Sequence, residues 1–409
     1  MSAMKNFVGW IDDRFPLTKV WNEHLAQYYA PKNFNFWYFM GSLALLVLVN
    51  QILTGVWLAM SYKPDATLAF GSVEYIMRDV DWGWLIRYMH STGASAFFIV
   101  IYLHMFRGLM YGSYRKPREL LWIIGVIIYL AMMATAFFGY LLPWGQMSYW
   151  GAQVIVNLFS AVPVIGPDLG VWVRGDYVIS DATLNRFFAL HFLLPFLLAA
   201  LVFIHIVALH KVGSNNPDGV EIKKNKDENG IPKDGIPFHP YYTVKDIAGV
   251  AGFLFLFAAV IFYAPEMGGY FLEHPNFEPA NPLKTPPHIA PVWYFTPFYA
   301  ILRAVPSMMG SAFPGVVAMF ASILVMFFLP WLDRSPVKSI RYKGGLYKTL
   351  LWLFVIDFIM LGYLGTQPTT WLYKVMAQVG TAYYFAFFLL MPIYSKLDKT
   401  KPVPERVTE

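Results

Sequence analysis

The sequence predicts an all-α membrane protein with eight transmembrane helices, and three observations support this prediction. First, 57% of the 409 residues are hydrophobic and only 14% are charged, whereas soluble domains are about 25% charged. Second, eight apolar segments reach the roughly 20 residues that a spanning helix needs. Third, the Lys and Arg residues cluster in short stretches between these segments, which argues against nucleic-acid binding despite the net charge of +6.

The predicted spans follow one another with two long interruptions. They are 36–60, 84–107, 121–142, 184–209, 247–265, 311–332, 348–366 and 373–394. The connection 143–183 contains Gly and Pro but is moderately apolar, so we expect short surface helices there. The connection 266–310 is rich in Pro and aromatic residues. The hydrophilic stretch 223–235 is expected to be a solvated loop.

The Lys and Arg residues also predict the orientation of the chain. Most of the 31 lie in the segment before the first span, in the connections that follow the second, fourth and sixth spans, and in the C-terminal tail. Because such positive connections stay in the cytoplasm, we expect a multi-pass protein of a bacterial inner membrane with both termini cytoplasmic. The N-terminus lacks the apolar core of a cleaved signal peptide. The lack of cysteine excludes disulfides, thiolate metal sites and covalently attached haem.

Two of the predicted spans carry histidine pairs with the same spacing. His90 and His104 are fourteen residues apart in the second span, and His191 and His205 are fourteen apart in the fourth. Residues at this spacing in an α-helix lie within about 40° of one face and about 21 Å apart along the axis. Both spans run from outside to inside, so His90 is level with His191 near the outer side. His104 is level with His205 near the inner side.

Two imidazoles at each level match the axial ligands of a six-coordinate haem b, because the porphyrin fills the other four positions. Zinc or copper sites take three or four clustered ligands, and neither level has a nearby carboxylate or thiol in sequence. A single intramembrane histidine is often a proton relay or a hydrogen bonder. Two identically spaced pairs favour two non-covalent b-type haems, with the four histidines as iron ligands.

Glycines in the first and third spans repeat this spacing. Gly41 and Gly55 are fourteen apart, and so are Gly125 and Gly139. Small residues also serve ordinary helix packing in membranes. Matched to the histidines, these glycines are expected to leave space for porphyrin. The first four spans are therefore expected to form a di-haem four-helix bundle.

Two arginines near the histidines are candidate partners of haem propionates. Arg87 lies one turn before His90, and Arg107 lies three residues after His104. A guanidinium pairs well with a carboxylate. Interfacial snorkelling of the long side chain is the alternative.

Long motifs occur along almost the whole chain. They are QILTGVWLAM (51–60), IRYMHSTGAS (86–95), GYLLPWGQMSYWGA (139–152), RFFALHFLLPF (186–196), LHKVGSNNP (209–217), FHPYYTVKD (238–246) and NPLKTPPHIAPVWYF (281–295). In these motifs the chain resembles cytochrome b of the quinol:cytochrome c oxidoreductases (the cytochrome bc complex, respiratory complex III), proteobacterial type. The resemblance implies a low-potential haem on His90 and His191 and a high-potential haem on His104 and His205. It also implies an N-terminal di-haem region, 1–215, and a C-terminal four-helix region, 216–409.

The resemblance implies a quinone-reducing site beside the inner haem. Its family residues match His210, Ser214, Asn215 and Asp246. Titratable groups facing the cytoplasm suit this reaction, because reduced quinone takes up two protons. A histidine at a helix end and an aspartate N-cap are the alternative interpretations of His210 and Asp246.

The resemblance also implies a quinol-oxidising site on the outer side. Its candidate residues are Tyr140, Gly151, Pro291, Val292, Trp293 and Tyr294. Aromatic and proline-fixed walls suit a flat ring. Many family members have a proton-accepting glutamate where this chain has Val292, and valine cannot accept a proton. Among the nearby carboxylates, Glu266, Glu273 and Glu278, we expect Glu266 to substitute; a merely solvated loop carboxylate is the alternative.

The function implied by the resemblance is a bifurcated quinol oxidation, in the catalytic subunit of a quinol:cytochrome c reductase. One electron would leave to a Rieske-type iron–sulfur protein and then to a membrane-anchored c-type cytochrome. The other would cross the lipid bilayer through both haems and reduce quinone. Proton release outside and uptake inside would generate a proton gradient. The resemblance further implies a homodimeric complex.

Two other functions stay open at this point. A haem b anchor of a dehydrogenase or hydrogenase would carry electrons without bifurcation and would lack the outer-site motifs. A secondary transporter with proton-relaying histidines would bind no haem. It would also favour an internal repeat, and the sequence has none beyond the shared spacing.

Overall fold

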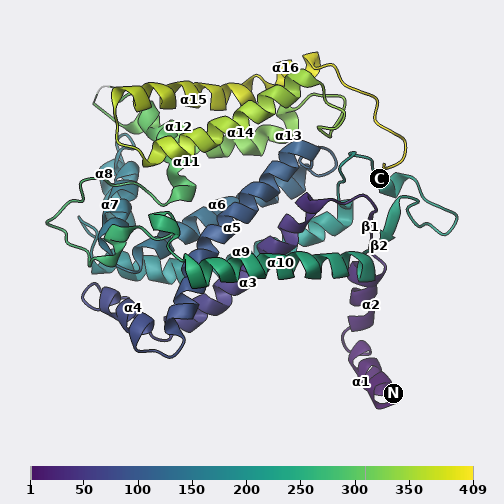
Figure 1. Ribbon diagram of the computed structural model, residues 1–409, viewed down its shortest axis with the longest axis horizontal. Coiled ribbons are helices and arrows are strands. Elements are labelled where there is room, and N and C mark those ends of the chain that lie inside the picture. Colours follow the sequence, from purple (N-terminus) through teal and green to yellow (C-terminus); the bar gives the residue numbers. More distant parts are fainter. Residues whose placement is uncertain (1, 309, 409) are drawn as a thin grey trace.

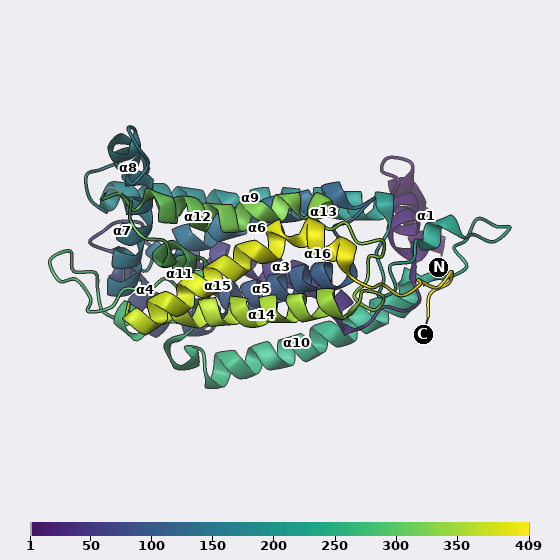
Figure 2. The same cartoon turned by 90° about the horizontal axis from the view of Figure 1, so that it is seen from above.

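The computed structural model describes residues 2–308 and 310–408, and it is built mainly of long helices. These helices lie side by side along the longest axis, and short helices and loops gather at the two ends (Figures 1 and 2). Both chain termini lie at the same end of the bundle, as an even number of spans requires.

The described residues form seven helices that are long and apolar enough to cross a membrane, and a bent pair makes an eighth. The first four are Phe36–Ala59 (η2 and α3), Gly83–Tyr111 (α5), Glu119–Leu141 (α6) and Asp181–Val212 (α9). The next three are Phe238–Tyr263 (η4 and α10), Phe313–Leu332 (α12, η8 and α13) and Gly345–Thr366 (α14). The bent pair is Trp371–Leu389 (α15) and Met391–Leu397 (α16), at 63°. The all-α class and the eight predicted spans are thus confirmed.

Short elements fill the connections. They are α1 (Ser2–Asp12), α2 (Leu17–Trp21), η1 (Asn22–Ala26), β1 (Tyr29–Pro31), α4 (Ala69–Arg78), α7 (Gln146–Ser160), α8 (Gly166–Arg174), η3 (Ile222–Lys224), β2 (Gly235–Pro237), η5 (Met267–Gly269), η6 (His274–Phe277), η7 (Trp293–Phe295) and α11 (Thr296–Ala304). The surface helices predicted for 143–183 are α7 and α8. The strands β1 and β2 pair antiparallel, with Ala30 opposite Ile236.

The stretch 223–235 is less solvated than its composition predicts. Most of it is exposed, but Asp234 is only 2% exposed. Its carboxylate accepts a hydrogen bond from Nε of Arg406 at 2.7 Å and lies 3.8 Å from Nζ of Lys32. One charge of this stretch therefore ties the C-terminal tail to the N-terminal segment.

Local signals fix the helix that carries the second histidine pair. Thr183 at the third position of α9 accepts a hydrogen bond from the backbone N–H of Ser180, which closes the N-terminus of the helix. His210 and Lys211 lie in its last turn, where positive charge complements the helix dipole. Gly213 ends it with a φ of +82° that favours glycine.

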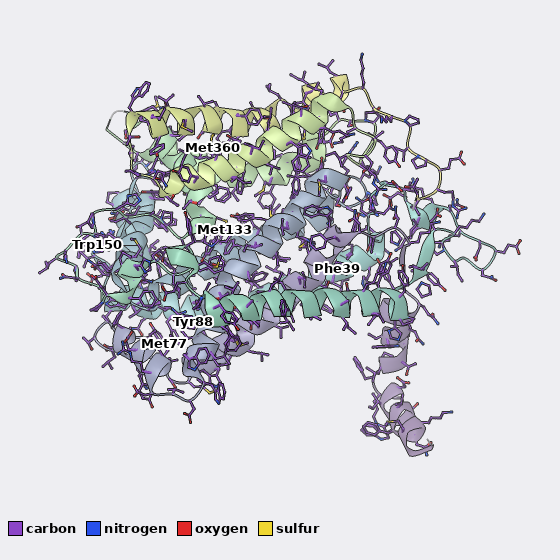
Figure 3. All side chains as sticks on the ribbon, viewed as in Figure 1. Phe39, Met77, Tyr88, Met133, Trp150 and Met360 are labelled. Carbon is purple, nitrogen blue, oxygen red and sulfur yellow. The ribbon has the colours of Figure 1, made fainter. Side chains whose placement is uncertain are left out.

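The first four spans pack in pairs that each join a glycine-bearing helix to a histidine-bearing helix. Helix α3 packs along α5, and α6 packs along α9, so each glycine-bearing helix faces a histidine-bearing helix. Helix α10 packs on α3 and α5. Phe39 of η2 lies beside α10 (Figure 3), and a Cβ at Gly249 would lie 3.1 Å from its ring. The division of the chain at residue 215 stays a prediction.

Candidate functional site

The outer pair of histidines meets between α5 and α9. The ring centroids of His90 and His191 are 6.1 Å apart, and the rings are almost perpendicular, at 86°. A metal–imidazole bond of about 2 Å on each side of one ion places the two nitrogens about 4 Å apart and the ring centroids farther out. The observed separation therefore suits two axial ligands of one iron. Among the residues that the structure describes, no cluster of three or more His, Asp or Glu is able to hold a metal ion.

Each of the four glycines faces one histidine ring. A Cβ atom at Gly139 would lie 2.3 Å from Cε1 of His191, and one at Gly55 would lie 3.1 Å from Cε1 of His90. The corresponding distances at the inner level are 3.4 Å from Gly125 to His205 and 3.6 Å from Gly41 to His104. The glycines thus make room for the imidazole rings themselves, whereas the sequence suggested room for porphyrin.

Hydrogen bonds orient the outer pair. The hydroxyl of Thr54 donates to Asn50 O at 2.6 Å, so its oxygen accepts from Nδ1–H of His90 at 2.9 Å. Nδ1–H of His191 donates to the carbonyl oxygen of Thr135 at 2.8 Å. Both bonds leave Nε2 unprotonated and free to bind a metal. Sequence reasoning missed Thr54 and Thr135.

The inner pair has one comparable contact. The His205 ring faces the backbone of Leu121, as the His191 ring faces that of Thr135. Nδ1 of His104 is buried and makes no hydrogen bond of normal geometry to a described residue.

One cavity joins the outer histidines to the expected quinol site. It encloses about 220 Å³ between α3, α5, α6 and α9. The sequence-predicted residues on its walls are Gly55, Arg87, His90, Gly139, Tyr140, His191, Val292 and Tyr294. The Tyr294 ring stacks on Phe98 at 3.8 Å and 5°, and Val292 and Tyr294 are each 4% exposed.

Three expected residues of the quinol site do not line this cavity. Gly151 lies behind it, where a Cβ would meet the Tyr140 ring at 3.3 Å. Trp293 turns away, donates from Nε1 to Ser95 Oγ at 3.0 Å, and lines a separate apolar cavity beside α14. Pro291 precedes the wall residue Val292 without reaching the cavity.

A second cavity, of about 960 Å³, contains all the inner-side candidates. They are Gly41, His104, Arg107, Gly125, His205, His210, Ser214, Asn215 and Asp246. Tyr28, Ser42, Arg118 and Lys245 also line it, and sequence reasoning missed these four. Leu48 and Phe97 line both cavities and separate them.

Neighbouring side chains hold the inner candidates in place. The His210 ring stacks on Tyr28 at 4.6 Å, and the Tyr28 hydroxyl lies 3.0 Å from Ser214 Oγ. Asp246 accepts a hydrogen bond from Ser42 at 3.3 Å and does not cap α10. Asn215 is 3% exposed and donates to the carbonyl of Tyr111 at 2.8 Å, so it also fixes the backbone.

The two arginines lack carboxylate partners. Neither Arg87 nor Arg107 forms an ion pair with an Asp or Glu of the described residues, and the Arg107 guanidinium lies 4.9 Å over the Tyr38 ring. Arg118, by contrast, binds Glu221 through two bonds of 2.7 and 3.0 Å. A cationic group in each cavity that has no carboxylate partner among the described residues fits an anionic ligand group such as a propionate.

Two carboxylates of the 266–310 connection differ in environment. The Glu266 side chain is 36% exposed and lies 3.9 Å from Nδ1 of His274. Oε2 of Glu273 is buried without a hydrogen bond to a described residue. Burial of its carboxyl raises the pKa of Glu273 to about 7, partly offset by its own backbone N–H and by the Tyr140 hydroxyl beside it. Sequence reasoning had favoured Glu266.

Comparisons with known proteins find similar proteins along almost the whole chain. Two family profiles match, "Cytochrome b/b6/petB" at residues 25–213 and "Cytochrome b(C-terminal)/b6/petD" at 279–385. The chain is 74% identical to "Cytochrome b" of Allochromatium vinosum, with 100% of both chains covered. It is 50% identical to "Cytochrome b/c1" of Bradyrhizobium diazoefficiens, over 98% of this chain and 56% of that protein. A chain of the solved "Hyperthermophilic respiratory Complex III" matches with a TM-score of 0.87 and 40% identity, over 95% of this chain and 98% of that one.

Proposed function

This chain belongs to the cytochrome b family, and we propose that it is the di-haem subunit of a proton-translocating quinol:cytochrome c reductase. One observation carries the proposal. His90 and His191 share a cavity with three of the residues expected to bind quinol, and His104 and His205 share a cavity with all four residues expected to bind quinone.

The donor set suits two b-type haems. The outer haem would be held by His90 and His191, with Gly55, Gly139 and Arg87 beside it, and the inner haem by His104 and His205, with Gly41, Gly125 and Arg107. When bound, the haems supply one-electron transfer between the two cavities. The protein ligates them, neutralises their propionates and excludes water.

The outer cavity suits the oxidation of quinol. Tyr140, Val292 and Tyr294 give it a largely apolar wall for a flat ring. Gly151 lets the Tyr140 ring lie back against α7. Trp293, which donates to Ser95, and Pro291 position this wall from behind.

The inner cavity suits the reduction of quinone. His210, Ser214 and Asp246 present polar groups toward it, and Asn215 holds the chain that carries them. His210 and Asp246 are able to deliver the two protons that reduced quinone takes up from the cytoplasm. The Lys245 ammonium, next to Asp246 in the same cavity wall, would attract the anionic form of the quinone ring.

The proposal includes partner subunits and a location. A Rieske-type iron–sulfur protein and a membrane-anchored c-type cytochrome would accept electrons on the outer side, in a homodimeric complex. A c-type partner is supported by the relative named "Cytochrome b/c1", of which this chain covers about half. The charge distribution and the shared end of the termini support a bacterial inner membrane with both termini cytoplasmic.

A reduced-minus-oxidised spectrum of the purified complex tests this function. We expect two b-type haems per chain; His104→Leu should remove one, and the matched loop variant His274→Leu should keep both. Inhibitor-sensitive quinol:cytochrome c reductase turnover then excludes a simple haem b anchor. Absence of haem in the intact complex would favour the transporter alternative and overturn the proposal.

A further inference from the structure

A carboxyl group in the connection between α10 and η7 has no role in the function described so far. Glu273 lies between η5 and η6, and its Oε2 atom is enclosed, with the Tyr140 hydroxyl beside the carboxyl group. A carboxyl group that is withdrawn from water beside a binding cavity is a candidate functional group.

The segment around Glu273 is fixed against the outer cavity. The side-chain oxygen of Asn276 accepts a hydrogen bond from the backbone N–H of Ser148 at 2.9 Å. The backbone N–H of Asn276 in turn donates to the carbonyl oxygen of Glu273 at 2.9 Å. The start of α7 therefore anchors the backbone that carries this carboxyl group.

The residues on either side of Glu273 form part of the cavity wall. Phe271, Leu272 and Asn276 line the outer cavity, and the Phe271 ring stacks on Trp293 at 6.4 Å and 23°. The Glu273 carboxyl is thus held at the rim of the cavity between these residues.

The titratable groups that face Glu273 are two tyrosines of the cavity wall. Tyr140 comes from α6 and Tyr294 from η7. The Tyr140 hydroxyl is buried and makes no hydrogen bond of normal geometry to a described residue. The next residue, His274, points outward with 73% of its side chain exposed. Glu273 therefore lies next to a residue that reaches the surface.

We infer that Glu273 accepts a proton from quinol bound in the outer cavity, through the hydroxyl of Tyr140, and releases it on the outer side. This inference rests on the proposed function. Quinol becomes quinone by losing two electrons and two protons; the iron–sulfur partner would take one electron together with one proton, and the outer haem would take the other electron. The second quinol O–H bond breaks as its proton passes to the Tyr140 oxygen, the Tyr140 O–H proton passes to the Glu273 carboxylate, and that proton then leaves to water. Glu273 thereby takes the place that Val292 leaves without an acid and that the sequence assigned to Glu266.

The pH dependence follows from the state of this carboxyl group. A carboxylate accepts a proton and a carboxylic acid does not, so a pKa of about 7 makes quinol oxidation rise with pH through neutrality. Replacement by glutamine removes the titrating group, so the rate should be low at every pH.

The test compares three variants of the whole complex in membranes: Glu273→Gln, the competitor Glu266→Gln, and the exposed control Glu278→Gln. We expect Glu273→Gln to lower kcat for quinol oxidation about tenfold to a hundredfold, with little change in KM and with a flat pH profile near neutrality. Glu266→Gln and Glu278→Gln should keep the parent profile. Infrared pH titration should show a protonated carboxyl band near pH 7 that Glu273→Gln lacks.

Haem spectra keep the two proposals apart. Normal b-haem spectra in all variants, with a parent-like pH profile in Glu273→Gln, would overturn the role of Glu273 and leave the proposed function standing. Loss of the pH dependence of quinol oxidation in Glu266→Gln alone would overturn the inference and identify Glu266 as the proton acceptor. If Glu273→Gln does not assemble, Glu273→Asp should assemble and keep the pH dependence, and Tyr140→Phe should lose it; the opposite result in either variant contradicts the inference.

Discussion

A Cβ atom at Gly139 would lie 2.3 Å from Cε1 of His191, closer than two non-bonded carbon atoms approach. Gly139→Ala should therefore displace the His191 ring and remove the outer b haem. Gly41→Ala is the matched control, because its Cβ would meet His104 at an ordinary 3.6 Å. Difference spectra should show loss of one haem in the first variant and both haems in the second. Retention of both haems in Gly139→Ala would contradict this prediction, because it would mean that the His191 ring is able to move aside and still bind haem.

Thr54→Val should weaken the outer haem site without touching the inner one. It removes the oxygen that accepts the hydrogen bond from Nδ1 of His90. Loss of a hydrogen bond to a metal-binding imidazole typically lowers metal affinity about 10–100-fold. Redox titration should show a changed midpoint for the outer haem alone. Thr135→Val is the control, since His191 bonds to the backbone carbonyl of Thr135 and not to its side chain. Equal shifts in both variants would contradict this assignment.

Asp246→Asn should slow the reduction of quinone in the inner cavity. The asparagine keeps the oxygen that accepts from Ser42 but is unable to deliver a proton. We therefore expect the rate of quinone reduction to fall about 10²-fold. The reoxidation rate of the inner haem after a flash or a rapid mix measures this step, while haem reduction from the outer side should be unchanged. Glu228→Gln, in the exposed stretch 223–235, is the charge-matched control. A parallel loss in both variants would point to surface charge instead.

Lys343→Met should destabilise the junction between α13 and α14. Nζ of Lys343 lies 2.6 Å from Oδ2 of Asp333, and both side chains are fully buried. Removal of one partner of a buried ion pair costs about 3–5 kcal/mol, because the other charge keeps its burial and loses its counter-charge. Lys19→Met is the control, since Lys19 and Glu23 are 3.9 Å apart and largely exposed, and such pairs contribute little. Thermal unfolding in detergent should give Lys343→Met a Tm many degrees below that of Lys19→Met.

The long spans and the two histidine levels could be predicted from the sequence, because both depend only on apolar length and on helix geometry. The glycines could be matched to the histidines by spacing, yet their contact with the imidazole rings depends on how α3 turns toward α5 and α6 toward α9. Thr54 was missed for the same reason. A threonine in an apolar helix gives no sign of the neighbour that its hydroxyl meets.

The outer site was less predictable because loops set it. Glu266 and Glu273 have the same chemistry and lie seven residues apart. Only the anchoring of Asn276 on Ser148 turns one carboxyl inward while the other stays exposed beside His274. Trp293 was expected in the wall with Tyr294, but its ring lines the separate cavity beside α14, and only its Nε1–H reaches Ser95 of the outer cavity wall. Such choices follow from tertiary contacts that spacing does not encode.

Leu48 and Phe97 belong to the walls of both cavities, so the cavities share one aliphatic and one aromatic side chain. Neither side chain offers a hydrogen bond along which a proton is able to hop. Electrons tunnel through such a layer, and protons do not. In the proposed function this apolar boundary would act as an insulating layer for protons, and a polar side chain at Leu48 or Phe97 would weaken that insulation.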